Sequence, residues 1–154
     1  MAQRVMRIVV PIVLVAPVVV AVFFYSARGA LNDREKIYRN LTTAERAVES
    51  SSVSDIMALV SEDYEDEYGN TKNTLTRLLL GALRQEAWEV NVQLEDLTIE
   101  DSTATSSLRV GIWPVDSPQS RRVYDVTIQW QRADGRWRAV SSSGWSDAQS
   151  DFML

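Results

Sequence analysis

Residues 124–145 read YDVTIQWQRADGRWRAVSSSGW, and their pattern predicts a β-hairpin. Aromatic and aliphatic residues alternate with polar ones over the first part, which is typical of a strand with one buried face. Asp134-Gly135 is a turn dipeptide that accepts a left-handed backbone. Trp137 and Ala139 begin the returning strand. The stretch therefore predicts two long antiparallel strands late in the chain.

Two further strands precede this hairpin. Apolar and polar residues alternate over residues 88–99 and 104–112. In the first of them the apolar set changes phase near Glu95-Asp96, as a β-bulge would cause. The segment DSPQS at 116–120 is a turn by composition. We therefore expect a meander of antiparallel strands.

Three amphipathic helices are expected before the strands. They begin at Asn32, at Ser52 and near Thr71, and the first two starts carry an acidic partner three residues later. Each helix has apolar residues at helical spacing. Helices followed by an antiparallel meander predict an α+β fold.

This order of elements resembles the nuclear transport factor 2-like superfamily, which also contains ketosteroid isomerases. The resemblance is carried by SEDYEDEYGNTKNTL (61–75), TATSSLRVGIW (103–113) and the hairpin above, and it covers about 32–145. It implies a cone-shaped domain, in which a curved antiparallel sheet packs on three helices and leaves a pocket at the wide end. The predicted core is Val53, Ile56, Val60, Leu75, Leu79, Val90, Val92, Val110, Val126, Ile128 and Trp137.

Several aromatic residues are candidates for lining that pocket: Tyr64, Tyr68, Trp88, Trp130 and Trp137. The bland alternative for the five tryptophans (88, 113, 130, 137 and 145) is core and sheet packing. In the ketosteroid isomerase branch a carboxylate base faces a hydrogen-bonding tyrosine inside the cone. Asp125 alternates with the apolar Tyr124 and Val126, so its side chain is expected to point away from the core. The resemblance therefore supplies no acid–base pair.

The chain has no cysteine and no histidine. This composition excludes disulfides, thiolate or imidazole metal ligands, and the commonest general base. No catalytic residue, metal site or cofactor is predicted.

The acidic stretch Ser61–Asn70 contains five carboxylates: Glu62, Asp63, Glu65, Asp66 and Glu67. A calcium loop counted from Asp63 would need glycine at position 6 and glutamate at position 12, where this chain has Tyr68 and Thr74. The calcium interpretation therefore fails. A solvated turn and a surface that docks a partner protein both stay open, and the solvated turn is favoured.

No residue from 8 to 27 is charged, a run of 20. As a helix it would extend about 30 Å, the thickness of a hydrocarbon core. We predict a single transmembrane helix at 8–27, between a short N-terminal segment 1–7 and a linker 28–31. A cleaved signal peptide is the alternative. Residues 146–154 have no periodicity and are expected to form a tail.

Residues 28–154 hold 14 of the 16 basic residues and all 21 acidic ones, a formal charge of −7. Such a surface disfavours nucleic acid and anionic lipid as partners. We expect a non-catalytic accessory subunit of a bacterial membrane complex, such as a photosynthetic or respiratory one. Its N-terminus would be cytoplasmic, its domain periplasmic, and its partners other membrane-protein subunits.

The alternative function is a small-molecule binder, or an isomerase-like enzyme, that uses the cone pocket. The interior of the cone separates the two hypotheses. Side chains that fill the wide end favour the accessory subunit, and a hollow wide end favours the small-molecule binder.

Overall fold

The computed structural model describes residues 32–146 and 149–150, the last two by their backbone alone. The predicted transmembrane segment 8–27 lies outside these residues. No helix in the described part of the chain is long and apolar enough to cross a membrane. Arg34–Leu154 form one compact unit. The buried residues of the hydrophobic core all lie between Ile37 and Ala139, inside this unit. The unit therefore contains the core that it needs to fold by itself.

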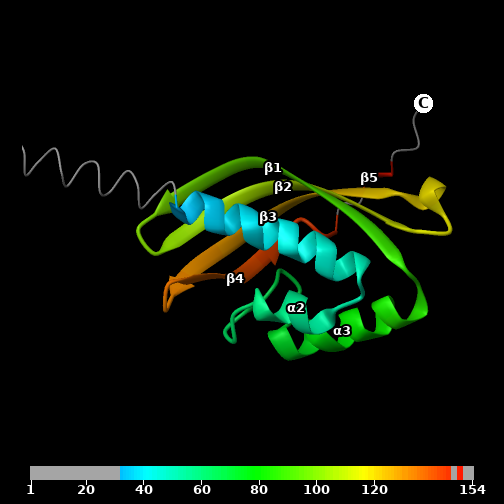
Figure 1. Cartoon of the computed structure of the whole chain (residues 1–154), viewed down its shortest axis with the longest axis horizontal. Coiled ribbons are helices and arrows are strands. Elements are labelled where there is room, and N and C mark those ends of the chain that lie inside the picture. The colour runs from blue at the N-terminus through cyan, green and yellow to red at the C-terminus, as the bar shows by residue number, and fades with distance from the viewer. Residues whose placement is uncertain (1–31, 147–148, 151–154) are drawn as a thin grey trace, which may run out of the picture. The chain divides into compact units, whose positions relative to one another are not determined.

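Four long strands form an antiparallel sheet in the order β1-β2-β3-β4, which confirms the predicted meander (Figure 1). They are β1 (Trp88–Glu100), β2 (Thr103–Pro114), β3 (Arg122–Ala133) and β4 (Arg136–Ser143). A short 3-10 turn, η1 (Pro118–Ser120), occupies the predicted turn before β3. A short fifth strand, β5 (Gln149–Ser150), pairs with the start of β3 and lies in the segment 146–154 that was expected to be only a tail.

Local irregularities bend this sheet. The register between β1 and β2 shifts between Leu94 and Asp96, which confirms the predicted bulge. A second shift, between Gln129 and Trp130, lies where β3 pairs with β4. Bulges add twist and bend the strand that carries them, so the sheet can curve around the helices. In the hairpin turn, Asp134 and Gly135 have φ values of 53° and 71°, as the turn dipeptide predicted.

The helices lie on one side of the sheet (Figure 1). The first covers residues 32–49, and it is followed by α2 (Val53–Ala58) and α3 (Lys72–Gln85). The second helix is shorter than predicted. Val60 leaves the helix and instead forms a parallel bridge with Ala139 of β4. The helical spacing of Val53, Ile56, Met57 and Val60 predicts a helix that reaches Val60, and pairing with the sheet ends the helix before that residue.

Side chains of the 32–49 helix hold it to two strands. Arg34 Nη2 donates to the Leu97 carbonyl of β1 at 3.0 Å. The backbone N–H of Val92, also in β1, donates to Glu45 Oε1 at 2.5 Å. Further along, Asn40 Nδ2 donates to a backbone carbonyl of β4 at 2.8 Å. These bonds satisfy polar groups of β1 and β4, the first and last strands in the order β1-β2-β3-β4, and fix the helix over the sheet.

The predicted core residues all pack in or against one hydrophobic cluster, but to different depths. Val60, Val110, Val126 and Trp137 are buried. Seven others are only partly buried: Val53, Ile56, Leu75, Leu79, Val90, Val92 and Ile128. Of these seven partly buried residues, all except Val53 line a cavity. These side chains point inward, as the apolar periodicity predicted, and they are only partly buried because they face a cavity.

Candidate functional site

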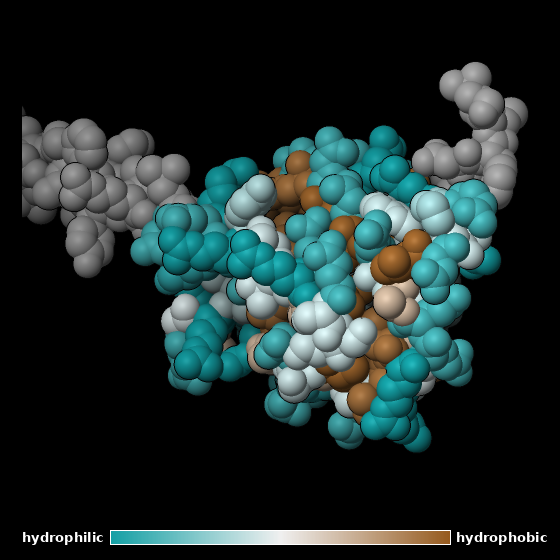
Figure 2. Space-filling view, turned by 45° about the vertical axis from the view of Figure 1, so that its right-hand side comes forward, coloured by the Kyte–Doolittle hydropathy of each residue, from teal (hydrophilic) through white to brown (hydrophobic). Residues whose placement is uncertain are grey.

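A cavity of about 460 Å³ lies between the sheet and the helices. Its size falls within the range of pockets that bind small molecules. Its apolar lining comes from all four long strands and from each helix. These apolar residues are Leu41, Ala44, Val48, Ile56, Leu59, Val60, Leu75, Leu79, Val90, Val92, Leu108, Val110, Ile112, Ile128, Trp130 and Ala139. Hydrophobic residues also gather between polar ones on the face of the domain drawn in Figure 2.

A smaller cavity of about 380 Å³ adjoins the first. Val48, Leu79 and Ile112 line both of them. Trp88 and Tyr124 add aromatic surface to the smaller cavity. The smaller cavity therefore lies beside the larger one, at the first residues of β1 and β3, and Arg122 is among the residues that line it.

The polar end of the larger cavity is built on Ser142 of β4. Its hydroxyl lies 2.6 Å from the Tyr64 hydroxyl. Trp145 Nε1 donates to the same serine oxygen at 2.8 Å. The Trp145 ring also packs on the Tyr124 ring, with 5.7 Å between centroids. The acidic segment, β4 and the turn after β4 thus combine into one hydrogen-bonded cluster, which we call the Tyr64 cluster (Tyr64, Ser142 and Trp145).

Burial raises the pKa of the Tyr64 phenol above its ordinary value of 10.0. The hydrogen bond with Ser142 opposes this shift, while the negative charges of Asp66 and Glu67 add to it. Tyr64 therefore keeps its proton at neutral pH and acts as a hydroxyl. It is not a phenolate base.

A raised folded-state pKa predicts that Tyr64 makes stability sensitive to alkaline pH. The stabilising contribution is present below pH 10.0 and is lost as the pH rises toward the folded-state pKa, because the unfolded chain loses the proton first. Urea unfolding between pH 8 and pH 11 should therefore show a steeper loss in the wild type than in Tyr64→Phe. Tyr38→Phe, at an exposed tyrosine, is the control and should behave as the wild type. Equal slopes in the wild type and Tyr64→Phe would contradict this account.

Two carboxylates line the larger cavity, Glu45 and Asp66. Glu45 accepts the Val92 N–H described above. Asp66 accepts the backbone N–H groups of Tyr68 and Asn70, at 2.9 and 2.8 Å, and the Asn70 side-chain amide at 2.9 Å. Both carboxylates thus have structural hydrogen bonds. Among the described residues that line this cavity there is no lysine and no arginine.

The acidic segment is more than a solvated turn. The N–H groups of Ser61, Glu65 and Glu67 donate to carbonyls of β4, so the segment runs along that strand. Glu67 Oε1 accepts the N–H groups of Gly144 and Trp145 at 2.9 and 2.8 Å. The segment therefore covers the edge of β4 and holds the following turn.

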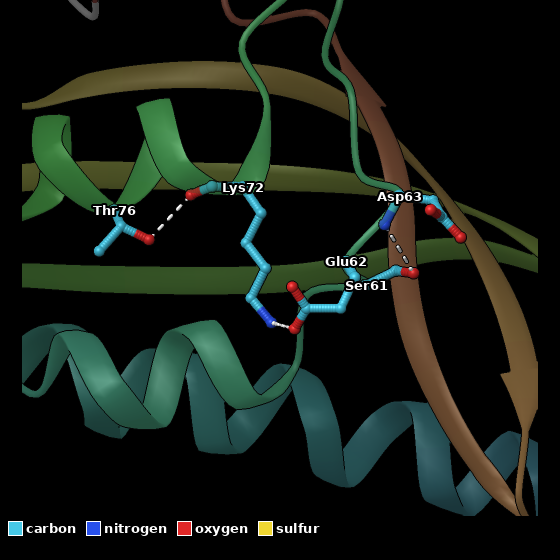
Figure 3. Close-up of polar contacts among 5 residues, drawn as sticks. All are labelled: Ser61, Glu62, Asp63, Lys72 and Thr76. Atoms are coloured by element: carbon cyan, nitrogen blue, oxygen red, sulfur yellow. Dashed lines mark hydrogen bonds and ion pairs between the residues drawn. The ribbon is translucent and has the colours of Figure 1, made fainter.

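Glu62, at the start of this segment, has a different contact. Lys72, the first residue of α3, reaches back to Glu62 Oε1 with an Nζ–O distance of 2.6 Å (Figure 3). Glu62 is largely exposed, so this ion pair contributes little to stability. Glu62, Asp63 and Glu65 are exposed, as the solvated-turn interpretation expected. Within the described residues no three acidic side chains converge as metal ligands would.

The contacts of Glu67 predict that its removal destabilises the domain. Glu67→Ala should lower the free energy of unfolding by about 1 kcal/mol, because two backbone N–H groups lose a charged acceptor. Glu67 and Glu65 are both exposed, but in the described part of the chain only Glu67 of the two accepts hydrogen bonds through its carboxylate, so Glu65→Ala should change this free energy by less than about 0.5 kcal/mol. Urea unfolding of both variants measures the difference. A larger loss of stability in Glu65→Ala than in Glu67→Ala would mean that the hydrogen bonds of Glu67 do not stabilise the domain.

The structure separates the predicted pocket residues. Tyr64 and Trp130 line the larger cavity, and Tyr68 lies at it with an exposed side chain. Trp88 lines the smaller cavity. Trp137 is 3% exposed and lines neither cavity, so its role is packing in the core.

Asp125 lies on the opposite face of the sheet, as the alternation predicted. It is exposed, and its Oδ1 lies 3.1 Å from Arg109 Nε.

Sequence reasoning missed Glu45, Asn40 and Ser142. Glu45 and Asn40 read as ordinary helix-surface residues, and only the packing of the helix against β1 and β4 turns them toward the cavity.

No protein-family model matches this sequence, and no curated protein matches it. Solved structures with similar folds do exist. A nuclear transport factor 2-like protein with a cystatin-like fold from Novosphingobium aromaticivorans is 21% identical, with a TM-score of 0.66 over 77% of this chain and 84% of that chain. Another nuclear transport factor 2-like protein, from Pseudomonas putida, is 15% identical, with a TM-score of 0.64 over 80% of this chain and 98% of that chain.

A third similar structure is a protein of unknown function with a cystatin-like fold from Nostoc punctiforme. It is 14% identical, with a TM-score of 0.64 over 77% of this chain and 92% of that chain. At these identities the likeness concerns the fold alone. The expected α+β cone of the nuclear transport factor 2-like type is therefore confirmed for the domain.

Proposed function

We propose that the domain binds a small, largely apolar molecule inside the cone. The observation that carries this proposal is the cavity of about 460 Å³ with its apolar lining. A domain that only docks on other proteins has no need of a hollow interior, and filling it would add stability. Between the two functions that the sequence left open, the interior therefore supports the small-molecule binder.

Binding without turnover is the simpler form of this proposal. Histidine and cysteine are absent from the chain. Of the carboxylates in the cavity, Glu45 and Asp66 both accept backbone hydrogen bonds that hold the fold. Tyr64 is a protonated hydroxyl at neutral pH. These groups suit recognition better than proton abstraction.

The test is direct binding of a neutral apolar probe. Residues 28–154, which include the whole compact unit, should bind the dye Nile red saturably at one site and increase its emission. Emission that rises linearly with dye, without saturation, would mean adsorption to the surface and would remove the proposal. The same titration on the protein unfolded in urea gives the baseline.

The membrane anchor and the accessory role are separate proposals, supported by the apolar run 8–27 and the acidic surface of the domain. In this form the domain is held outside the cytoplasm by a single N-terminal helix, beside other membrane-protein subunits. Docking through Glu62, Asp63, Glu65, Asp66 and Glu67 is part of the same proposal. Asp66 and Glu67 have structural contacts, so Glu62, Asp63 and Glu65 are the acids most available to a partner. Binding a small molecule and docking on a complex are compatible.

A further inference from the structure

The smaller cavity, of about 380 Å³, combines an apolar lining with a single cation. Apart from Ser120 and Arg122, the described residues that line it are apolar or aromatic, and Arg122 is the only charged residue among them. Trp88 Nε1 donates to the Ala82 carbonyl at 3.3 Å, so the polar atom of this indole already has a partner. The volume lies within the range of pockets that bind small molecules. The cavity therefore suits a ligand with an apolar body and one polar end.

Strand pairing places Arg122 on the inner face of the sheet. Side chains of a strand alternate between its two faces, and Val126, four residues after Arg122, is part of the buried core. Arg122 also lies directly opposite Ile112 of β2, which lines both cavities. Residues opposite each other in a sheet share a face. The side chain of Arg122 is exposed as well as part of the lining, so it lies where the cavity meets solvent.

Arg122 has a guanidinium that the fold does not use. Within the described part of the chain it forms no hydrogen bond or ion pair through its side chain. The neighbouring Arg121 is engaged differently, since its guanidinium lies 5.0 Å from the centre of the Trp113 ring, on the other face of the strand. A guanidinium offers a planar set of donors that can bind a carboxylate through two parallel hydrogen bonds. Arg122 therefore has free donors at the open end of an apolar cavity.

We propose that the smaller cavity binds a single-chain carboxylate, such as a medium-chain fatty acid, with its carboxylate on Arg122 and its chain against Leu83 and Trp88. One cation matches a head group with one negative charge. A phosphate monoester carries about −1.5 to −2 charges and would call for a second cation, which the described lining lacks. Because Arg122 lies at the solvent-exposed end, the carboxylate stays partly hydrated and only the chain is buried. This site goes beyond the proposed function, which concerns the larger cavity.

Three probes with the same chain test the proposal: octanoate, 1-octanol and octylamine. Each is titrated by calorimetry into residues 28–154 at pH 7, where the acid is ionised and the amine is protonated. Octanoate should bind saturably, and at least about fivefold more tightly than octylamine, because only the anion gains a charged hydrogen bond with Arg122. Octylamine that binds as tightly as octanoate would overturn the proposal.

Variants of the two adjacent arginines then identify the head-group site. Arg122→Gln should weaken octanoate binding about fivefold and leave 1-octanol binding unchanged, because it removes the charge and keeps a polar side chain. Arg122→Lys keeps the charge and should restore part of the octanoate affinity. Arg121→Gln is the matched control, since it removes the same charge from the outer face, and it should bind octanoate as the wild type does. Equal losses in Arg121→Gln and Arg122→Gln would mean that only the general charge of the domain matters, which contradicts the proposal.

A substitution in α3 locates the chain of the ligand. Ala82 lines the smaller cavity and not the larger one, so Ala82→Trp should occupy the space of the octyl chain and weaken octanoate and 1-octanol alike, by at least about fivefold. Leu78→Trp adds the same indole to an exposed position on this helix that lines neither cavity, and it should bind both probes normally. Wild-type binding in a folded Ala82→Trp overturns the proposal, as does the absence of saturable octanoate binding. The Nile red titration decides the proposed function independently, because it uses a neutral probe.

Discussion

Leu79→Trp is expected to weaken Nile red binding by at least about tenfold. Leu79 of α3 lines both cavities and is only partly buried, so a larger side chain there would extend into the hollow interior. Overpacking a filled core usually costs stability, but space is available at this position. The variant should therefore stay folded and lose the volume that the ligand would occupy. Equilibrium titration with the dye measures the loss.

The neighbouring residue supplies the matched control. Leu78 lies on the same helix, is 56% exposed and lines neither cavity. Leu78→Trp adds the same indole to the surface and should bind the dye as the wild type does. Val92→Phe tests the cavity from the sheet side and should again weaken binding. If both filling variants bind with wild-type affinity while circular dichroism shows them folded, the dye site lies elsewhere.

Deletion of residues 1–27 is expected to move almost all of the protein from the membrane fraction to the soluble fraction of a bacterial host. The deleted part contains the uncharged run, whose transfer into a bilayer is strongly favourable. The full-length chain should resist extraction by alkaline carbonate. Added protease should digest its domain in spheroplasts and spare it in intact cells.

The control for this experiment is deletion of residues 2–7, which leaves the apolar run whole and should leave the protein in the membrane. A mature full-length product that begins near residue 28 would show that the run is a cleaved signal peptide. Protection of the domain in spheroplasts would reverse the proposed orientation. Neither outcome bears on the cavity, since the compact unit starts at Arg34.

The amino-acid pattern was sufficient to predict three helices, the four long strands and the face of each that turns inward, although the second helix ends earlier than predicted and the short strand β5 was missed. Alternation of apolar and polar residues predicted the strands and the Leu94/Asp96 bulge, and the Asp134-Gly135 dipeptide predicted the hairpin turn. These features depend on neighbours in the chain, because side-chain direction repeats every two residues in a strand and every 3.6 in a helix. For the same reason Asp125 could be placed on the outer face.

Only the tertiary structure decided what the inward faces enclose. Periodicity tells that Val92 and Leu79 point inward, but it cannot tell whether they meet each other or a cavity, because that depends on the curvature of the sheet and the distance to the helices. The Tyr64 cluster depends in the same way on the acidic segment running along β4, which brings together residues 78 positions apart in the chain. Local sequence patterns carry no information about such contacts between distant residues. The sequence by itself thus determined the helices, the four long strands and their buried faces. The strand β5, the early end of the second helix, the hollow interior with its polar end, and the structural roles of Glu45, Asp66 and Glu67 arise from how the elements pack.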